Sequence, residues 1–129
     1  MCLDVVEKVY KKSMPEKIGY KVMDVYCHRR YLPFQGKMAT PIPIKKWIDE
    51  KDYRVNELLS CRVLYCYDFQ NKSYPYGFHV YENLKDAKGN CFDGMKIYSV
   101  YMKDIVARGK QDDCSVFVAK KIKLIKVVN

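Results

Sequence analysis

The chain has 129 residues, of which 49% are hydrophobic and 30% are charged, with a formal net charge of +9 at pH 7. This length is typical of a single domain, and the apolar content is sufficient for one core, which argues against global disorder. We therefore expect one domain spanning residues 1–129. The apolar runs fall far short of the roughly 20 residues that cross a bilayer. The first residues lack the basic lead and apolar stretch of a secretory signal, so we expect a cytoplasmic protein without membrane contact.

The charge balance, 24 Lys and Arg against 15 Asp and Glu, excludes mimicry of DNA by surface charge. A positive surface is attracted to phosphate, nucleic acid or an acidic protein face, and this attraction depends strongly on salt. The alternative is that the excess lysines only keep a small domain soluble.

Cysteine usage points to a reducing compartment. Without an export signal, cysteines are expected to be reduced and to pack as small hydrophobic side chains. A structural zinc site is the alternative, but the chain has no Cys-x-x-Cys and only two histidines. We therefore expect neither a metal nor a cofactor. The six cysteines are Cys2, Cys27, Cys61, Cys66, Cys91 and Cys114.

The first elements in chain order are an ambiguous segment and a hairpin. Residues 1–12 fit a helix or a strand equally well. Residues 20–26 are rich in β-branched and aromatic side chains and predict a strand. Residues 27–30 resemble the tip of a hairpin that returns through residues 31–34.

Residues 35–52 are predicted to form a long loop. Pro41 and Pro43 each remove a backbone donor, which excludes a regular central strand there. Long loops in compact domains are often functional, and this one contains the only tryptophan, Trp47. The alternative is that Trp47 fills the edge of the core.

The middle of the chain predicts two strands and a short helix. Residues 58–69 alternate as a strand does, and residues 71–75 have the composition of a turn. Residues 76–82 predict a strand that runs directly into a helix over residues 83–88. Asn83 is suited to cap this helix and Gly89 to end it.

The last third predicts an antiparallel pair of long strands, residues 96–107 and 115–126, joined by a turn at residues 111–113. Together these elements predict an α+β fold: a mainly antiparallel sheet or small barrel of about five or six strands, with one or two short helices.

Two groups of basic and aromatic residues are candidates for ligand binding, because Arg and Lys bind phosphate and aromatic rings stack on bases. The first lies at the predicted hairpin tip, where the alternative is a solvated turn. The second lies in and just after the predicted loop. The first group comprises Tyr26, His28, Arg29 and Arg30 with Tyr31 beside them, and the second comprises Lys45, Lys46 and Trp47 with Tyr53 and Arg54.

His79 is the remaining candidate, as a ligand-binding residue or as the centre of an enzyme site. Glu82 lies three residues further along, so the two side chains point to opposite faces of a regular strand and should not pair. The alternative is a histidine hydrogen-bonded in the core or at its margin. The lysines of the last strand, among them Lys121 and Lys123, are interpreted as protection of a sheet edge.

Several segments resemble a family of small phage and prophage proteins: the opening Met-Cys-Leu, Gly-Tyr-Lys-Val at residues 19–22, Tyr-Gly-Phe-His-Val-Tyr at residues 76–81 with the helix that follows, and Val-Ala-Lys-Lys at residues 118–121. The resemblance implies a mobile-element protein acting inside a bacterial cell. It would be a counter-defence factor that binds a host immune protein or sequesters a nucleotide signal. The corner at residues 77–87 also resembles one in ADP-ribosyltransferase-like folds.

These observations favour a non-enzymatic binding protein whose positive face engages an anionic nucleotide or an acidic host defence protein. The first alternative is an ADP-ribosyltransferase-like or other nucleotide-acting enzyme centred on His79. The second is a nucleic-acid-binding module. Homo-oligomerisation is compatible with each, because small strand-rich domains often leave pairing edges.

Overall fold

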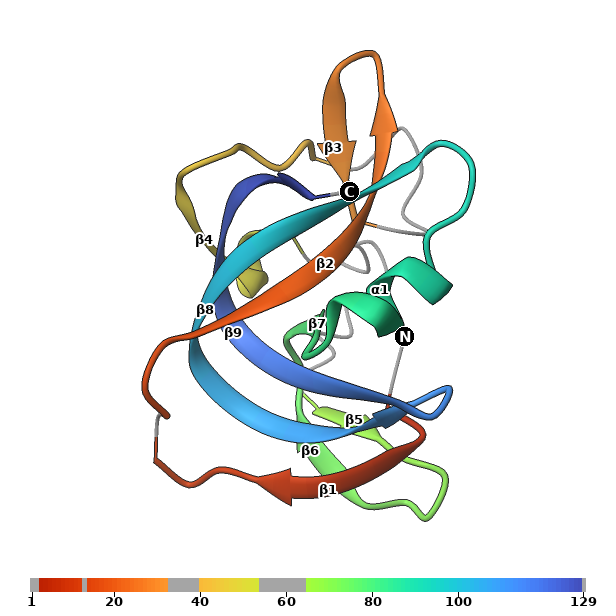
Figure 1. Ribbon diagram of the computed structural model, residues 1–129. Helices are drawn as coiled ribbons and strands as arrows, with labels where there is room; N and C mark the ends of the chain where they lie inside the picture. Colours follow the sequence, from red (N-terminus) through yellow and green to blue (C-terminus); the bar gives the residue numbers. More distant parts are fainter. Residues whose placement is uncertain (1–2, 13, 33–39, 54–64, 129) are drawn as a thin grey trace.

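The computed structural model describes residues 3–12, 14–32, 40–53 and 65–128. Within these ranges, seven strands form one antiparallel sheet in the order β1-β8-β2-β7-β9-β4, with β3 attached to β2 and β8 also paired to β9 (Figure 1). β5 and β6 form a separate two-stranded sheet. The elements are β1 (Val5–Val9), β2 (Lys17–Tyr26), β3 (Arg29–Tyr31), β4 (Trp47–Asp49), the 3-10 helix η1 (Glu50–Tyr53), β5 (Tyr65–Tyr67), β6 (Ser73–Pro75), β7 (Phe78–Tyr81), α1 (Leu84–Gly89), β8 (Met95–Gln111) and β9 (Cys114–Val128).

The β8–β9 hairpin is the longest paired element of the described sheet, since its strands are paired from Gln111↔Cys114 at the turn to Ile97↔Val128 at the open end. Asp112 and Asp113 form the turn with φ of 49° and 62°. Two consecutive residues with positive φ give a turn whose twist matches the twist of paired strands. The predicted long antiparallel pair is therefore confirmed.

A bulge bends β8 in its middle and allows its two halves to pair with different strands. Asp104 has a φ of 53°, and the register with β9 shifts between Ile105 and Ala107. Such bulges increase local twist and bend a strand. Before the bend β8 pairs with β2, and after it β8 pairs with β1.

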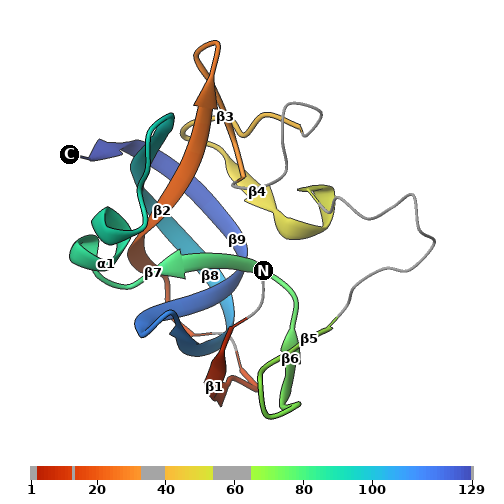
Figure 2. The same cartoon turned by 90° about the vertical axis from the view of Figure 1, so that its right-hand side faces the viewer.

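The main core lies inside the curve of the sheet. Because β2 and β4, which are separated in the strand order, both contribute to one cluster of buried side chains, the sheet is curved around that cluster (Figures 1 and 2). The cluster includes Met23, Ile42, Ile48, Phe78, Val80, Tyr98, Val100, Met102, Ile105, Phe117, Ile122 and Leu124. Two smaller clusters lie under β1 with β6 and under α1. α1 and β4 lie on opposite sides of the molecule in both views.

Gly109 and Gly19 permit close approach of neighbouring strands. A Cβ atom at Gly109 would lie 2.1 Å from the carbonyl oxygen of Val5 on β1. One at Gly19 would lie 2.5 Å from Cγ1 of Val80 on β7. Both distances are far inside van der Waals contact, so any larger residue would displace a strand.

The prediction of a mainly antiparallel sheet is confirmed, whereas the finer details need correction. The main sheet has seven strands in the described part of the chain and is not a barrel. Helix there is limited to α1 and η1, so α+β describes the fold only in part. No helix among the described residues is long and apolar enough to cross a membrane.

Three local predictions need revision. Residues 1–12, left open, contain strand β1. The predicted loop at residues 35–52 contains β4 and the start of η1, because backbone pairing with β9 stabilises a three-residue strand that local sequence does not favour. The predicted turn at residues 71–75 is wrong in part, since Ser73–Pro75 pairs with β5.

The remaining local predictions are confirmed where the structure describes them. The strand at residues 20–26, its hairpin and the strand-to-helix corner at residues 78–88 are present. Asn83 is the N-cap residue, although its side chain makes no capping hydrogen bond. Residues 58–64 of one predicted strand and residues 33–34 of the hairpin return lie outside the described residues.

Candidate functional site

Trp47 is presented on the outer face of the sheet by β4. In the antiparallel register Trp47 lies opposite Lys123 of β9. Side chains alternate along a strand, so Ile48 points into the core and Trp47 points away from it. Trp47 is half-buried, and it is Ile48, rather than Trp47, that fills the core from this strand.

Two ammonium groups lie against the indole ring. Lys103 Nζ is 4.1 Å and Lys123 Nζ is 5.1 Å from the ring centroid. Lys123 Nζ also lies 5.4 Å from the ring centroid of Tyr101, its cross-strand neighbour on β8. These distances are within the range of cation–π attraction, which is worth about 0.5–1 kcal/mol at exposed sites. The contacts hold two long, flexible side chains at one aromatic ring.

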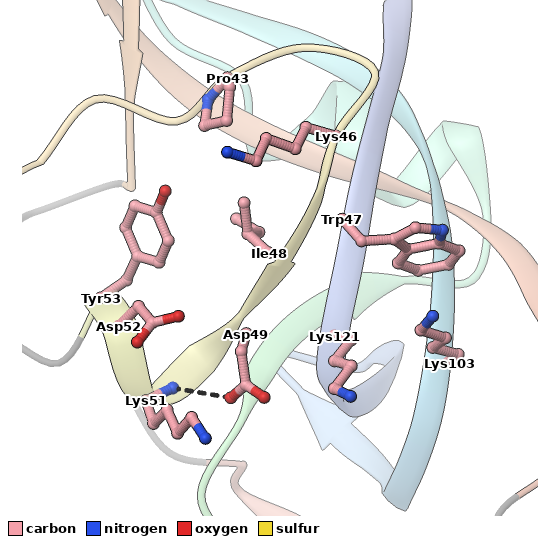
Figure 3. A pocket seen from close by; sticks show the side chains of 10 residues that line it. All are labelled: Pro43, Lys46, Trp47, Ile48, Asp49, Lys51, Asp52, Tyr53, Lys103 and Lys121. Carbon is pink, nitrogen blue, oxygen red and sulfur yellow. Dashed lines mark hydrogen bonds between the residues drawn. The ribbon is translucent and has the colours of Figure 1, made fainter.

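A pocket of about 430 Å³ opens beside Trp47, and its lining residues lie on both sides of β4 (Figure 3). This volume is within the range of small-molecule sites. Tyr53 and Trp47 lie toward opposite sides of it (Figure 3). Four lysines and two aspartates line the pocket, so their formal charges sum to +2: Lys46, Lys51, Lys103, Lys121, Asp49 and Asp52.

The charges around the pocket are only partly paired. Lys121 Nζ lies 3.7 Å from Asp104 Oδ2, and Asp49 Oδ1 accepts a hydrogen bond from the backbone N–H of Lys51. Neither Lys103 nor Lys123 forms an ion pair with a carboxylate in the described ranges. The two ammonium groups at the indole ring are thus available to an anion.

Tyr53 occupies the other side of the pocket. Its ring packs against Phe78 of the core with ring centroids 6.4 Å apart. Burial, followed by the negative charge of Asp52, raises the pKa of the Tyr53 phenol. Tyr53 is therefore a neutral hydrogen-bonding group at neutral pH, anchored by the core.

The predicted hairpin tip does not join this pocket. Tyr26, His28 and Arg29 are exposed, and the turn places Cys27 and His28 at φ of 51° and 64°. Arg30 is tied to the backbone: its Nε donates to the carbonyl oxygen of Ile42 over 2.9 Å. Arg30 therefore holds the segment that leads into β4, which is a structural role that sequence reasoning missed.

Within the second predicted group, the structure supports Lys46 and Trp47 as pocket residues. Lys45 is exposed, has a φ of 60°, and its backbone N–H donates to the carbonyl oxygen of Leu124 over 2.7 Å. It turns the chain into β4 and does not line the pocket. Arg54 lies outside the described residues.

His79 lies apart from the pocket, among polar contacts at the margin of the core. Its Nε2 is 3.4 Å from the Tyr74 hydroxyl, and its carbonyl oxygen accepts a hydrogen bond from Lys21 Nζ over 2.7 Å. Burial, with the positive charge of Lys21, lowers the His79 pKa to about 3. Glu82 pairs instead with Arg108 over 3.0 Å. These contacts match the interpretation of a hydrogen-bonded histidine.

Sequence reasoning missed Lys103, Lys121 and Lys123 as site residues. The interpretation of the last-strand lysines as edge protection is wrong for Lys121 and Lys123, because β9 is paired on both sides there, with β4 and with β8. The alternation of lysines along residues 119–126 was visible, but the strand that carries Trp47 to them was not.

Comparison with known protein families, curated proteins and solved structures gave no match. Among the described residues, no group of three or more His, Cys, Asp or Glu side chains is arranged to hold a metal ion. The described cysteines form no disulfide with one another: Cys66 is buried and Cys27 is exposed. The site therefore has to be interpreted from its own geometry.

Proposed function

We propose that the protein is a non-enzymatic binding protein that holds an anionic nucleotide at the Trp47 site, defined as Lys46, Trp47, Lys103, Lys121 and Lys123. The observation that supports this most strongly is the pair of ammonium groups, from Lys103 and Lys123, at 4.1 Å and 5.1 Å from the centre of the Trp47 ring. They place positive charge directly beside an aromatic surface, which is the combination that a nucleotide requires.

The electrostatics of the site favour an anion. Lysine is a compact point charge that binds phosphate oxygens, and its attraction is strengthened where few carboxylates compete. Lys103 and Lys123 have no carboxylate partner among the described residues. Their contacts with Trp47 also restrict the side chains before binding, which reduces the entropy lost when a ligand arrives.

The resemblance to small phage proteins supplies a biological context for the proposal. In that context the ligand would be a nucleotide signal of a bacterial host, and sequestering it would be a counter-defence activity. An acidic surface of a host defence protein is the competing partner, because it would meet the same lysines.

The proposal is tested with ATP, using the fluorescence of Trp47, the only tryptophan in the chain. We expect saturable quenching by ATP and much weaker quenching by adenosine, which shares the base and lacks the phosphates. Lys103→Gln should weaken ATP binding about tenfold, since hydrogen bonds to charged groups contribute about 1.5–3 kcal/mol. ATP should be recovered unaltered after prolonged incubation.

The matched control is Lys96→Gln, which removes the same charge from an exposed position on the same strand, β8. It should leave ATP binding within the experimental error. The proposal would be overturned if ATP failed to bind at low salt, or if the two variants weakened binding equally. Quenching by a glutamate-rich peptide but not by ATP would replace the nucleotide with an acidic protein partner, and turnover of ATP would refute the non-enzymatic role.

A further inference from the structure

The Trp47 site continues across the sheet as a row of half-buried and exposed side chains. The register places Trp47 of β4 opposite Lys123 of β9, Lys123 opposite Tyr101 of β8, and Tyr101 opposite Ile18 of β2. Tyr101 is 36% exposed and Ile18 is 56% exposed. The row thus runs over four strands on a face that is open at Tyr101 and Ile18.

Along this row the side chains are aromatic (Trp47), cationic (Lys123), aromatic (Tyr101) and aliphatic (Ile18). Adjacent strands are about 4.8 Å apart, so the two rings are separated by about 10 Å with one ammonium group between them. Lys123 Nζ lies 5.1 Å from the Trp47 ring and 5.4 Å from the Tyr101 ring. One cation is therefore shared by two aromatic surfaces.

Cations also flank the row on the next register position. Lys103 and Lys121 lie opposite each other on β8 and β9, two residues from Tyr101 and Lys123. Asp104 and Asp49 are the nearby acids: Asp104 contacts Lys121, and Asp49 lies opposite Lys121 in the register. The three lysines around the row thus exceed the two acids near it, and the face is complementary to a negatively charged chain.

Resting on the proposed function, we infer that this row binds single-stranded nucleic acid. Two successive bases stack on Trp47 and Tyr101, and the phosphate between them lies at Lys123, with Lys103 and Lys121 on the neighbouring phosphates. Sheet faces that present aromatic residues bind single strands by base stacking, and basic side chains beside the rings contact the phosphate backbone. A duplex would not fit this arrangement, because its bases are not free to stack on protein rings.

The test compares a fluorescein-labelled oligothymidylate of about six nucleotides, within the site sizes of such surfaces, with a duplex of equal length and with ATP. Anisotropy should show the oligothymidylate binding at least about tenfold more tightly than either. Tyr101→Thr keeps a strand-favouring residue and removes the ring, and it should weaken oligothymidylate binding about tenfold. ATP binding should remain unchanged in this variant, because Tyr101 does not line the pocket.

Salt dependence supplies a second readout. Single strands give a slope of about −0.7 in log affinity against log salt for each phosphate neutralised, so three lysines predict a slope of about −2. Lys123→Gln should make this slope shallower by about 0.7. The control is Tyr67→Thr, which removes a 59% exposed tyrosine from the separate β5–β6 sheet and should change neither affinity nor slope.

The outcomes separate this inference from the proposed function. If ATP binds but the oligothymidylate binds no more tightly, or if Tyr101→Thr and Tyr67→Thr act alike, the inference is refuted and the nucleotide site stands. Equal or tighter binding of the duplex also refutes it, in favour of non-specific attraction to phosphate. If neither ATP nor the oligothymidylate binds at low salt, both proposals fall.

Discussion

Lys21 is a buried charge whose removal should stabilise the protein. Its side chain is 7% exposed and lies on the inner face of β2, opposite the buried Tyr98 and two residues from Met23. Its Nζ donates one hydrogen bond, to the carbonyl oxygen of His79. Burial lowers the Lys21 pKa from 10.5 to about 8. An ammonium group in this position is poorly solvated, so Lys21→Met should increase the free energy of unfolding.

The magnitude follows from the two pKa values. Below pH 8 Lys21 is charged in both the folded and the unfolded protein. Between pH 8 and pH 10.5 the folded protein has released the proton while the unfolded chain still holds it, so stability rises with pH. A difference of about 2.5 pKa units corresponds to about 3 kcal/mol in total, of which about 2 kcal/mol is gained between about pH 7 and pH 9.5.

Lys21→Met should abolish this gain. At neutral pH the variant avoids the cost of about 3 kcal/mol and loses one hydrogen bond worth about 1 kcal/mol, for a net stabilisation of about 2 kcal/mol. The comparison is limited to pH values below about 9.5 because of Tyr81, whose pKa is raised by burial to about 12. Above about pH 10 the unfolded chain releases the Tyr81 proton while the folded protein retains it, so stability falls with pH there.

The assay is urea unfolding followed by Trp47 fluorescence at several pH values between about 7 and 9.5. Subtracting the Lys21→Met curve from the wild-type curve removes the contributions of cysteines and tyrosines, which the two proteins share. Lys96→Met, at an exposed position of β8, should leave the pH dependence unchanged. If the wild-type and Lys21→Met curves run parallel over this range, the reasoning about a buried charged lysine is wrong.

Two further predictions concern packing and charge elsewhere. Gly109→Ala should lower the free energy of unfolding by at least about 2 kcal/mol, because its methyl group would lie 2.1 Å from the Val5 carbonyl oxygen. The control is Gly89→Ala, whose methyl group meets nothing within 4 Å and which should be near neutral. Equal thermal midpoints of the two variants would contradict the close approach of β1 to β8. Lys120→Met should also destabilise, by about 1–3 kcal/mol, because Lys120 Nζ contacts the buried Glu50 at 3.3 Å and donates to a backbone carbonyl. Lys123→Met should lower the thermal midpoint less than Lys120→Met, because it removes only contacts with two partly exposed rings; a larger loss at Lys123 than at Lys120 would contradict both roles.

Much of the fold could be predicted from local sequence. The two long strands are specified by alternation and by the Asp112–Asp113 turn between them, and the corner from β7 into α1 is specified by alternation and a helix stop, each within one continuous stretch of the chain. β4 could not be predicted in this way. It is three residues long, follows two prolines, and exists because β9 supplies its hydrogen bonds.

The candidate site, too, could be predicted only where its residues are close together in the sequence. Lys46 and Trp47 were predicted together because they are adjacent in sequence. Lys103 and Lys123 come from strands more than 50 residues away, and only the cross-strand register brings them to the indole ring. The hairpin tip was predicted to bind a ligand because it has the same basic and aromatic residue types as the loop. Composition could not show that the Arg30 side chain donates a hydrogen bond to the carbonyl oxygen of Ile42 instead.

The lysines of β9 show why net charge alone does not define a function. Lys120 points toward Glu50 and stabilises the interior, Lys121 is partly neutralised by Asp104, and Lys123 lies between two aromatic rings. These three residues lie within four positions of one strand, yet they differ in whether their charge is available to a ligand. Their neighbours on β4, η1 and β8 cause the difference, since the alternation of side chains decides which face each lysine occupies and the strand register decides which residue it meets. The positive charge of this chain is therefore better tested residue by residue than as a whole, and Lys123 is the position where a change in binding without a change in stability would identify a functional cation.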